Sequence, residues 1–548
     1  MNTATQATFN GTRNTSVASY DAIVVGAGVS GLYQVHRLRE EGFTVRAFET
    51  GSDVGGTWYW NRYPGARFDS EAYIYQYFFS EALYKEWSWS ERYPGQEEVE
   101  QWLHFVADRL NLRKDIQFNT RIDQAHYDED RKRWVIKTNT GETFESQFFI
   151  ACTGMLSAPL TDKFEGQRSF KGQLIHTGRW PKDPVEYKGK RVGVIGNGAT
   201  GIQVIQTIAG KPDLLQVFIR TPQYMIPMRN PKYTDEDIAH YKSRYKELIS
   251  KLPHTFSGFE YEFVGAWQDM TPEARLEALE EIWADGSLRL WIGSFAELFT
   301  DPEVSEEISE FVREKMRKRL NYDQRLCDLL IPTEYGFGTY RVPLETNYLE
   351  AYLRDDVELV SVKDNPIARI VPEGIQLEDG TIHKLDIIIM ATGFDAATGS
   401  LTRIDIRGRD GRSLKADWAE DIRTAMGLKV HGYPNLFMTG APLAPAAALC
   451  NMPTCLQQQV DWITDCMVHM REQNKTEIEA TQETQDAWTE HHDEVANATL
   501  VPQTNSWYMG GNVEGKPRRL LSYIGGVGNY RKQCDDIREQ GYPGFNLA

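Results

Sequence analysis

Residues 20–32 read YDAIVVGAGVSGL, and this stretch decides the fold class of the 548-residue chain. It begins with mostly apolar and β-branched residues and runs straight into a glycine-rich turn, which predicts a short buried strand at 20–25. Apolar residues then recur with helical spacing from Leu32 to Leu38, which predicts a helix directly after the turn. The three glycines of the turn are Gly26, Gly28 and Gly31. A strand, a G-x-G-x-x-G turn and a helix in this order form a dinucleotide-binding unit, in which phosphates approach the N-terminus of the helix.

An acidic residue follows at the position where such units bind a ribose. We expect a second strand at 44–49, which ends at Glu49, eighteen residues after Gly31. A carboxylate at this distance suits a pair of ribose hydroxyls. The alternative is a glycine-rich turn that binds nothing, which the flanking strand and helix make a poor interpretation.

The same succession of elements occurs again at residues 190–220. A predicted strand at 190–195 leads into the turn GNGATG, and a helix at 202–208 and a strand at 215–220 follow. The turn contains Gly196, Gly198, Thr200 and Gly201. This strand ends at Arg220 instead of an acid, and a guanidinium there can pair with a 2′-phosphate, which favours NADP over NAD. A surface arginine without a ligand is the alternative.

Two dinucleotide sites of different character imply an electron path within one chain. The unit with the acid is expected to hold FAD, and the unit with the arginine is expected to hold NADPH. The sequence therefore predicts an α/β fold with two Rossmann-like dinucleotide-binding domains.

Composition limits the function further. Lys and Arg number 60 against 78 Asp and Glu, and the net charge of −18 argues against binding to nucleic acid or to an anionic membrane. No apolar run approaches eighteen residues, and residues 1–19 lack the features of a signal peptide, so we expect a flexible N-terminal arm. Six cysteines in so long a chain do not suggest a disulfide framework and fit a reducing, cytoplasmic location.

Secondary-structure patterns divide the rest of the chain. β-Hairpins are expected at 115–150, strands at 356–390 and a helix near 457–472. Thr271 and Asp301 each stand before a proline at a first helical position, which predicts helix starts. Apolar strands that close on Thr-Gly mark where the chain passes between the units. We assign an FAD-binding domain to 20–154 and 391–548, an NADP-binding domain to 155–229 and 331–390, and a helical insertion to 230–330.

Two further motifs lie beside these units. Residues 55–69 read GGTWYWNRYPGARFD, an aromatic loop that we expect to pack near the flavin, with a core-packing role equally open for Trp60. Fifteen residues before the second glycine-rich turn, a pattern of the form F-x-G-x-x-x-H-x-x-x-W-P is complete. Its residues are Phe170, Gly172, His176, Trp180 and Pro181.

With these motifs the chain resembles the Baeyer–Villiger monooxygenases, class B flavoprotein monooxygenases that convert ketones to esters or lactones. The resemblance runs over nearly the whole chain from about residue 20 and points toward the phenylacetone and cyclohexanone monooxygenases. It implies FAD, NADPH, O₂ and a lipophilic ketone as reaction partners. It also implies that the F-x-G…W-P motif couples domain movement to turnover, so His176 is expected to have a mainly structural role.

The resemblance places the catalytic centre at Arg341 and Asp69. The oxidant would be a flavin C4a-peroxide, an anion beside an apolar substrate, and a guanidinium remains charged and can hold that anion. Asp69 would orient Arg341 and balance its charge. The peroxide would add to the ketone to give a tetrahedral adduct that rearranges to the ester or lactone. No metal ion is expected to take part.

Cofactor contacts also follow from the resemblance. Thr57, Trp58, Tyr75 and Met452 match flavin-binding positions, and Thr221 and Trp507 match positions near NADP. The family usually has a lysine directly before the active-site arginine, but this chain has Tyr340, so Arg220 is expected to carry most of the NADP preference.

A loop at 441–451, reading APLAPAAALCN, aligns with a substrate-lining loop of the family. Its small residues suggest a roomy apolar wall, and the alternative is a simple Ala/Pro loop. The positions expected to contact substrate are Leu443-Ala444, Ala447 and Leu449.

Three rival functions remain. An N- or S-oxygenating flavin monooxygenase would oxidise amines or sulfides without converting ketones. A disulfide reductase is a poor match, because Cys450 and Cys455 lie far from the first unit, where Trp58 occupies the place of that family's redox pair. A flavin redox sensor would bind both cofactors without substrate-dependent NADPH consumption. The ketone, its selectivity and the oligomeric state stay open, and a monomer is compatible with the sequence.

Overall fold

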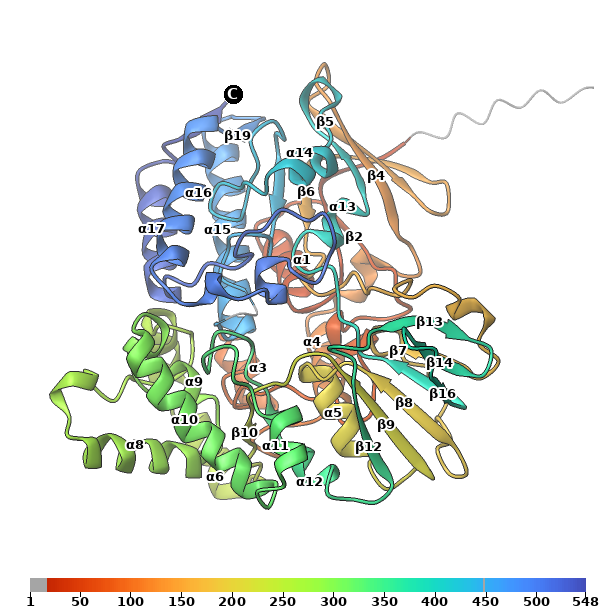
Figure 1. Ribbon diagram of the computed structural model, residues 1–548. Helices are drawn as coiled ribbons and strands as arrows, with labels where there is room; N and C mark the ends of the chain where they lie inside the picture. The colour runs from red at the N-terminus through yellow and green to blue at the C-terminus, as the bar shows by residue number, and fades with distance from the viewer. Residues whose placement is uncertain (1–16, 447–448) are drawn as a thin grey trace, which may run out of the picture.

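The computed structural model describes residues 17–446 and 449–548, so most of the expected arm at 1–19 lies outside the described residues. The first strand, β1 (Ala18–Val25), begins two residues earlier than predicted. Figure 1 shows three parts: a large sheet with the C-terminal helices packed beside it, a second sheet, and a group of helices next to both.

The first sheet has the strand order β17-β4-β5-β6-β1-β2-β3, and β18 pairs with β6. β1 runs parallel to β2 and β6, whereas β4, β5 and β6 form the antiparallel ribbon that the hairpin pattern predicted. Besides β1, its strands are β2 (Val45–Phe48), β3 (Ile116–Gln117), β4 (Ile122–Asp128), β5 (Arg133–Thr138), β6 (Thr143–Ala151), β17 (Asp405–Arg407) and β18 (Leu436–Met438).

The helix after β1, α1 (Val29–Glu40), packs against α15 (Met452–Glu472), which begins five residues earlier than predicted. The Tyr33 hydroxyl donates to Asp461 at 2.6 Å, and Gln34 Nε2 donates to Thr464 Oγ1 at 3.0 Å. Residues near the C-terminus therefore cover the first dinucleotide unit.

The second sheet is parallel throughout, in the order β12-β9-β8-β16-β7. Its strands are β7 (Gln173–His176), β8 (Arg191–Ile195), β9 (Leu214–Ile219), β12 (Val357–Ser361) and β16 (Ile387–Met390). Helix α5 (Ala199–Ile208) lies so close to the second glycine-rich turn that a Cβ on Gly201 would be 2.3 Å from Gly196 O. A small antiparallel sheet follows, with β13 (Ile367–Val371), β14 (Gly374–Leu377) and β15 (Ile382–Lys384).

The chain passes between the two sheets at 152–154 and 391–393, directly after β6 and β16. These are the Thr-Gly turns from which the crossings were predicted. The crossings run side by side, because Leu160 N donates to Gly393 O and Thr392 Oγ1 donates to Leu160 O, each at 3.1 Å. The two dinucleotide units are therefore joined at one place.

Two helices of the group beside the sheets start where the sequence predicted. Thr271 Oγ1 accepts from Ala274 N and caps α8 (Pro272–Asp285), and Asp301 caps α10 (Pro302–Arg319). The other helices of this group are α6 (Asp235–Ser243), α7 (Tyr245–Lys251), α9 (Arg289–Ile292) and α11 (Gln324–Leu330).

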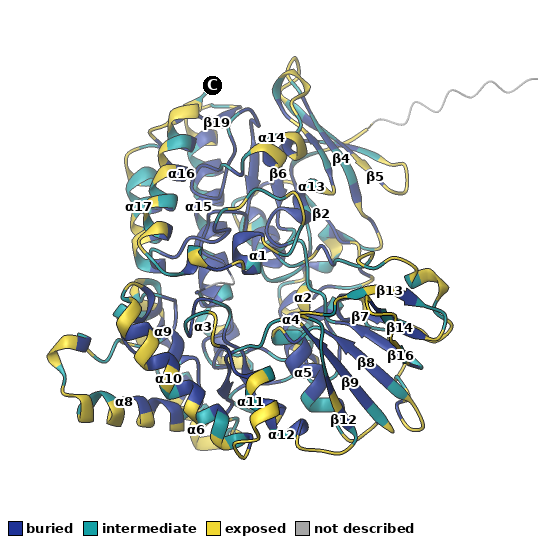
Figure 2. Cartoon of the chain, in the orientation of Figure 1, coloured by how far each residue is buried: buried dark blue, intermediate teal, exposed yellow. Residues whose placement is uncertain are grey.

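The remaining elements complete the surface around the sheets. They are α2 (Thr57–Trp60), α3 (Glu81–Glu86), α4 (Gln96–Arg109), α12 (Tyr348–Ala351), α13 (Gly399–Thr402), α14 (Leu414–Glu420), α16 (Gln482–Asn497), α17 (Val527–Glu539), β10 (Ile226–Pro227), β11 (Leu344–Glu345), β19 (Ile478–Ala480) and β20 (Phe545–Leu547). Figure 2 shows the central strands buried and the outer helices exposed on one side only. Within residues 17–446 and 449–548, no helix is long and apolar enough to cross a membrane.

Gly31 leaves no room for a side chain, because a Cβ there would lie 2.0 Å from Gly26 O. We expect Gly31→Ala to push α1 off the turn and to cost about 1–3 kcal/mol, measured as a lower midpoint of thermal unfolding. Gly198→Ala is the matched control, since within the described residues no atom lies within 4 Å of a Cβ there. Equal midpoints for Gly31→Ala and the unsubstituted protein would contradict this packing.

Candidate active site

A cavity of about 410 Å³ lies where the two sheets, the helical group and the C-terminal part meet. Its walls come from ten separate stretches of the described sequence. Seven lie within 58–75, 198–203, 259–292, 340–341, 391–394, 449–452 and 507–512, and the other three contribute Leu156, Thr177 and Gln223. The second glycine-rich turn borders this cavity directly, and the aromatic loop that follows the first unit forms another wall.

Arg341 and Asp69 form an ion pair at the cavity. Arg341 Nη2 lies 2.5 Å from each carboxylate oxygen of Asp69, although the two residues are 272 positions apart. Burial works against the charge of Arg341, but Asp69 and Tyr508 outweigh it and raise the pKa of Arg341 above its ordinary value. The guanidinium is therefore charged at neutral pH inside the cavity.

Two aromatic residues hold the same guanidinium from other directions. The centre of the Trp291 ring lies 5.3 Å from the guanidinium carbon, a cation–π distance, and Tyr508 hydrogen-bonds to Arg341. Trp291 Nε1 also donates to Gly338 O at 3.0 Å, three residues before Arg341. A Cβ on Gly338, whose φ is +87°, would lie 2.9 Å from the Trp291 ring, so glycine permits this contact.

Three of the four residues expected from the resemblance to contact the flavin reach the cavity. Trp58, Tyr75 and Met452 all line it. The Phe68 ring stacks on Tyr75 with the centres 4.3 Å apart, and Trp58 Nε1 donates to the Tyr75 hydroxyl at 3.1 Å. Thr57 is exposed on the first turn of α2 and is not among the described residues that line the cavity.

The first glycine-rich turn fits the pyrophosphate of a dinucleotide. Among the described residues, no side chain caps the N-terminus of α1 after Gly28, so its backbone amides remain for a ligand. The backbones of Gly28 and Gly56 approach so closely that a Cβ on Gly28 would lie 3.2 Å from Gly56 Cα. A side chain at Gly28 or Gly56 would fill the space that a phosphate needs at this turn.

Glu49 lies buried at the end of β2, where an acid was predicted to bind a ribose. Its Oε2 accepts from Ala27 N at 2.9 Å, and its Oε1 accepts from Gly51 N at 2.6 Å. Burial raises the pKa of Glu49, and these backbone bonds offset part of the rise. The Trp60 side chain also hydrogen-bonds to Glu49, so this carboxylate links the first turn, the end of β2 and the aromatic loop.

The second glycine-rich turn offers a similar N-terminus. No side chain of the described residues caps α5 after Gly198, and both Gly198 and Thr200 line the cavity. The Tyr63 hydroxyl donates to Gln203 Oε1 at 2.8 Å and so attaches α5 to the aromatic loop that follows the first unit. The two units are thus joined by a direct contact.

Of the residues at the expected 2′-phosphate site, Tyr340 lines the cavity, whereas Arg220 and Thr221 are not among the described residues that line it. Arg220 follows β9 and is exposed. Tyr340, which stands where the resemblance led us to expect a lysine, contacts Tyr335 with ring centres 4.3 Å apart. The Tyr335 hydroxyl in turn donates at 2.6 Å to the backbone oxygen of Pro222, the residue after Thr221. Lys163 lies near Arg220, and burial together with the charge of Arg220 lowers the pKa of Lys163.

The F-x-G…W-P residues lie along the edge strand β7 and the turns around it. They are Phe170, Gly172, His176, Trp180 and Pro181. A Cβ on Gly172 would lie 2.2 Å from Asp386 O, so glycine is needed there. His176 is buried, and its Nδ1 accepts from Gly178 N at 3.0 Å. These residues anchor the second sheet next to the crossing at 391–393, while Trp180 packs against the main core.

The loop expected to contact substrate divides into two parts. Leu443 and Ala444 are fully buried and are not among the described residues that line the cavity. Leu449 does line it. Ala447 lies outside the described residues.

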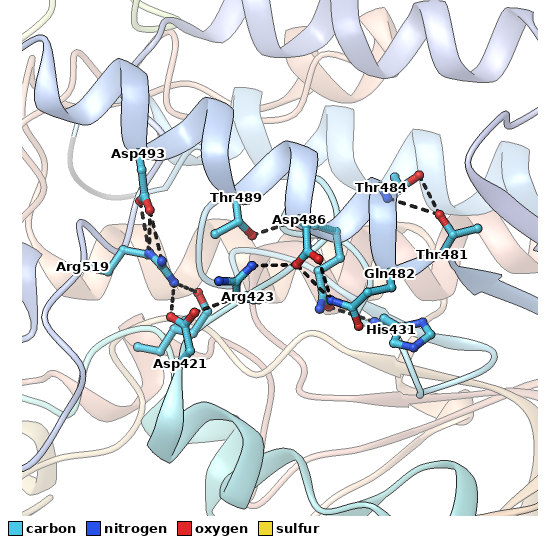
Figure 3. Close-up of polar contacts among 12 residues, drawn as sticks. Asp421, Arg423, His431, Thr481, Gln482, Thr484, Asp486, Thr489, Asp493 and Arg519 are labelled. Carbon is cyan, nitrogen blue, oxygen red and sulfur yellow. Dashed lines mark hydrogen bonds and ion pairs between the residues drawn. The ribbon is translucent and has the colours of Figure 1, made fainter.

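Ion pairs anchor the C-terminal segment that brings Trp507 and Tyr508 to the cavity. Figure 3 shows Arg519 between Asp421 and Asp493, and Arg519 Nη2 lies 3.0 Å from Asp493 Oδ2. Closer to the cavity, Lys516 Nζ donates to Asp395 Oδ1 at 2.7 Å beside the crossing. The segment is therefore tied to the end of α14, to α16 and to the domain junction.

The cysteine chemistry does not fit a disulfide reductase. All six cysteines lie within the described residues and are free. Cys450 lines the cavity and donates to Ala446 O at 3.0 Å. Burial raises the pKa of Cys450, which disfavours the thiolate that disulfide exchange requires.

The sequence reasoning missed several residues of the cavity. Tyr508 is not among the described residues that line the cavity, but it hydrogen-bonds to Arg341, and it could have been found as the neighbour of Trp507. Trp291, Phe259 and Ile292 come from the helical insertion, where no motif marks them. Only the fold brings them beside Arg341.

Comparisons with known proteins agree with this geometry. A family model described as flavin-binding monooxygenase-like matches residues 20–262. The chain is similar to an acetone monooxygenase (methyl acetate-forming) from Gordonia sp. strain TY-5, with 63% identity over 97% of this chain and 100% of the relative. It is also similar to a closed crystal structure of cyclohexanone monooxygenase, with 36% identity, a TM-score of 0.94, and coverage of 97% of this chain and 100% of that chain.

The chain is also similar to a crystal structure of OTEMO in complex with FAD and NADP. It is 38% identical, with a TM-score of 0.93 and coverage of 97% of this chain and 100% of that chain. The predicted α/β fold with FAD and NADP domains is therefore confirmed.

His176 makes the stability of the protein depend on pH. Burial, opposed by the Gly393 backbone and helped by Arg179, lowers the pKa of His176 to about 4 from its ordinary 6.5. Between these values the unfolded chain binds a proton that the folded chain does not, so stability is full above pH 6.5 and falls toward pH 4. The loss attributable to His176 is on the order of 3 kcal/mol.

We expect His176→Asn, which keeps an acceptor for Gly178 N, to flatten this dependence in urea unfolding between pH 6.5 and 4. The exposed His240→Asn serves as the control and should leave the dependence unchanged. If His176→Asn loses stability in acid as steeply as the unsubstituted protein does, His176 is not the group responsible.

Proposed function

The chain belongs to the Baeyer–Villiger monooxygenases, which use FAD, NADPH and O₂ to convert ketones to esters or lactones, and within this activity we propose that its substrates are small acyclic ketones. The observation that carries the proposal is the 63% identity to a relative named for acetone and methyl acetate. The cavity supports it, because about 410 Å³ must accept the reactive parts of two cofactors as well as the ketone.

Bulky apolar side chains define the substrate side of the cavity. Phe259, Trp291 and Ile292 are almost fully buried and come from the helical insertion. Such a wall favours a compact apolar ketone, and it excludes water from the reaction. The size of the pocket thus supports a short-chain substrate over a cyclic or polycyclic one.

Arg341 is the residue that we propose to be catalytic. FAD reduced by NADPH supplies the activation of O₂ when both cofactors are bound. Arg341 lies at the meeting point of both units with a charge that burial does not remove, so it can stabilise negative charge that develops on oxygen. Asp69 orients the guanidinium and keeps the net charge of the pair near zero.

Other residues serve to bind the cofactors. We propose that the backbone amides after Gly28 bind the pyrophosphate of FAD and that the Glu49 carboxylate binds its ribose. Trp58, Tyr75 and Met452 would contact the flavin. The amides after Gly198 would bind the pyrophosphate of NADPH, with Thr200 and Trp507 beside it. Arg220, helped by Lys163, would bind the 2′-phosphate in place of the missing lysine at 340, with Thr221 adjacent.

The six free cysteines support a cytoplasmic location for the enzyme, because reducing compartments keep thiols free.

Removal of the Arg341 guanidinium separates oxygen chemistry from cofactor reduction. We expect Arg341→Ala to bind FAD and to bleach it with NADPH at a rate near that of the unsubstituted enzyme, while ester formation falls by about 10²–10³-fold. Anaerobic stopped-flow absorbance gives the first rate, and gas chromatography gives the ester. Retained ester yield in Arg341→Ala would overturn this assignment.

A panel of ketones tests the substrate class. We expect kcat/KM for acetone and butanone to exceed that for cyclohexanone and phenylacetone by about tenfold or more, because an oversized ring must displace the buried wall. NADPH consumption corrected for hydrogen peroxide, with products identified by mass, provides the measurement. Preference for the cyclic or aromatic ketones would refute the proposed class and leave the reaction type intact.

A further inference from the structure

Glu71 is a buried carboxylate that the proposed mechanism does not use. It lies two residues after Asp69 and is 3% exposed. Its Oε1 accepts from the Tyr261 hydroxyl at 2.5 Å, from Arg92 Nη2 at 3.0 Å and from the Tyr93 hydroxyl at 3.3 Å. Three donors on one buried oxygen make Glu71 the centre of a network outside the catalytic cavity.

The network joins the loop of Asp69 to the helical insertion. Arg92 Nη2, which contacts Glu71, also lies 3.2 Å from both carboxylate oxygens of Asp285 at the end of α8. Arg92 Nη1 donates to Asp285 O at 3.1 Å. Tyr261 provides a second link, since it too belongs to the insertion. Glu71 is therefore attached to both ends of the 261–285 segment.

The substrate wall lies just beyond the two ends of this segment. The ring of Phe259, which lines the cavity, stacks on Tyr261 with the centres 5.2 Å apart and the planes 13° apart. Gly293, at the end of α9, packs so closely that its missing Cβ would lie 2.5 Å from Tyr261 Cβ. Helix α9 (Arg289–Ile292) contributes Trp291 and Ile292 to the wall. Tyr261 thus lies between the two halves of the wall and contacts Glu71 through its hydroxyl.

We propose that Glu71 is a positioning residue that sets the separation between Asp69–Arg341 and the substrate wall, and thereby the preference for small ketones. The backbone fixes Glu71 relative to Asp69, and its carboxylate fixes Tyr261 and hence Phe259 and α9. This inference rests on the proposed function, because it explains how a small-ketone pocket is held at its size.

The alternative is that the network only stabilises the fold. A purely structural role would lower stability and scale down turnover of all ketones alike. A positioning role changes the ratio of kcat/KM values between small and large ketones, because the wall relaxes away from the ion pair. The ratio therefore separates the two roles.

The decisive variant is Tyr261→Phe, which removes one hydroxyl and keeps the stacked ring. We expect the acetone-to-cyclohexanone ratio of kcat/KM to fall by about tenfold, mostly through a higher KM for acetone, with the rate of flavin reduction unchanged. Glu71→Leu should lower the ratio in the same way, and Glu71→Gln, which keeps an acceptor for Tyr261, should retain most of it.

A matched control is available in Tyr245→Phe. Tyr245 also extends from the helical insertion to the first unit, where its hydroxyl donates to Phe78 O at 2.7 Å, but it does not border the wall. It should leave the ratio unchanged. If Glu71→Leu does not fold, Tyr261→Phe still decides the outcome.

A ratio in Tyr261→Phe that stays within about twofold of the unsubstituted enzyme would overturn the positioning role. The ratio of the unsubstituted enzyme tests the proposed substrate class, whereas its change among these variants tests Glu71, so the two failures are distinguishable.

Discussion

The ion pair between Asp69 and Arg341 is the interaction on which the rest of the site depends. Two charges removed from water are expensive unless their geometry and further hydrogen bonds compensate the lost hydration. Here Asp69, Tyr508 and the Trp291 ring surround one guanidinium, and they come from three distant parts of the chain. The pair can form only when the aromatic loop, the helical insertion and the C-terminal segment have all reached their places.

The fold provides these places through repetition of one unit. Each glycine-rich turn leaves a helix N-terminus open for phosphate, and each unit ends in a strand that closes on Thr-Gly. The two closing turns lie side by side, joined by hydrogen bonds between Leu160 and the 391–393 crossing. The second turn and the aromatic loop that follows the first unit both border one cavity, and Arg341 lines it.

Sequence reasoning predicted the parts of the site that depend on local chain geometry. The G-x-G-x-x-G turns, Glu49 after its strand, and the caps at Thr271 and Asp301 each need only a few neighbouring residues, so their patterns are visible in one sequence. Trp291 and Phe259 could not be predicted, because nothing near them in the chain relates them to Arg341. Leu443 and Ala444 fill the core instead of lining the cavity, because the loop turns inward before it reaches Leu449.

The account rests on Asp69 acting through Arg341 and not independently of it. The most direct test is a double-mutant cycle on the ester formed per NADPH consumed, with Asp69→Ala, Arg341→Ala and the double variant. If Asp69 acts only by holding the guanidinium, the double variant will lose no more coupling than Arg341→Ala alone. Losses that add in the double variant would contradict the account, because they would assign Asp69 a separate role.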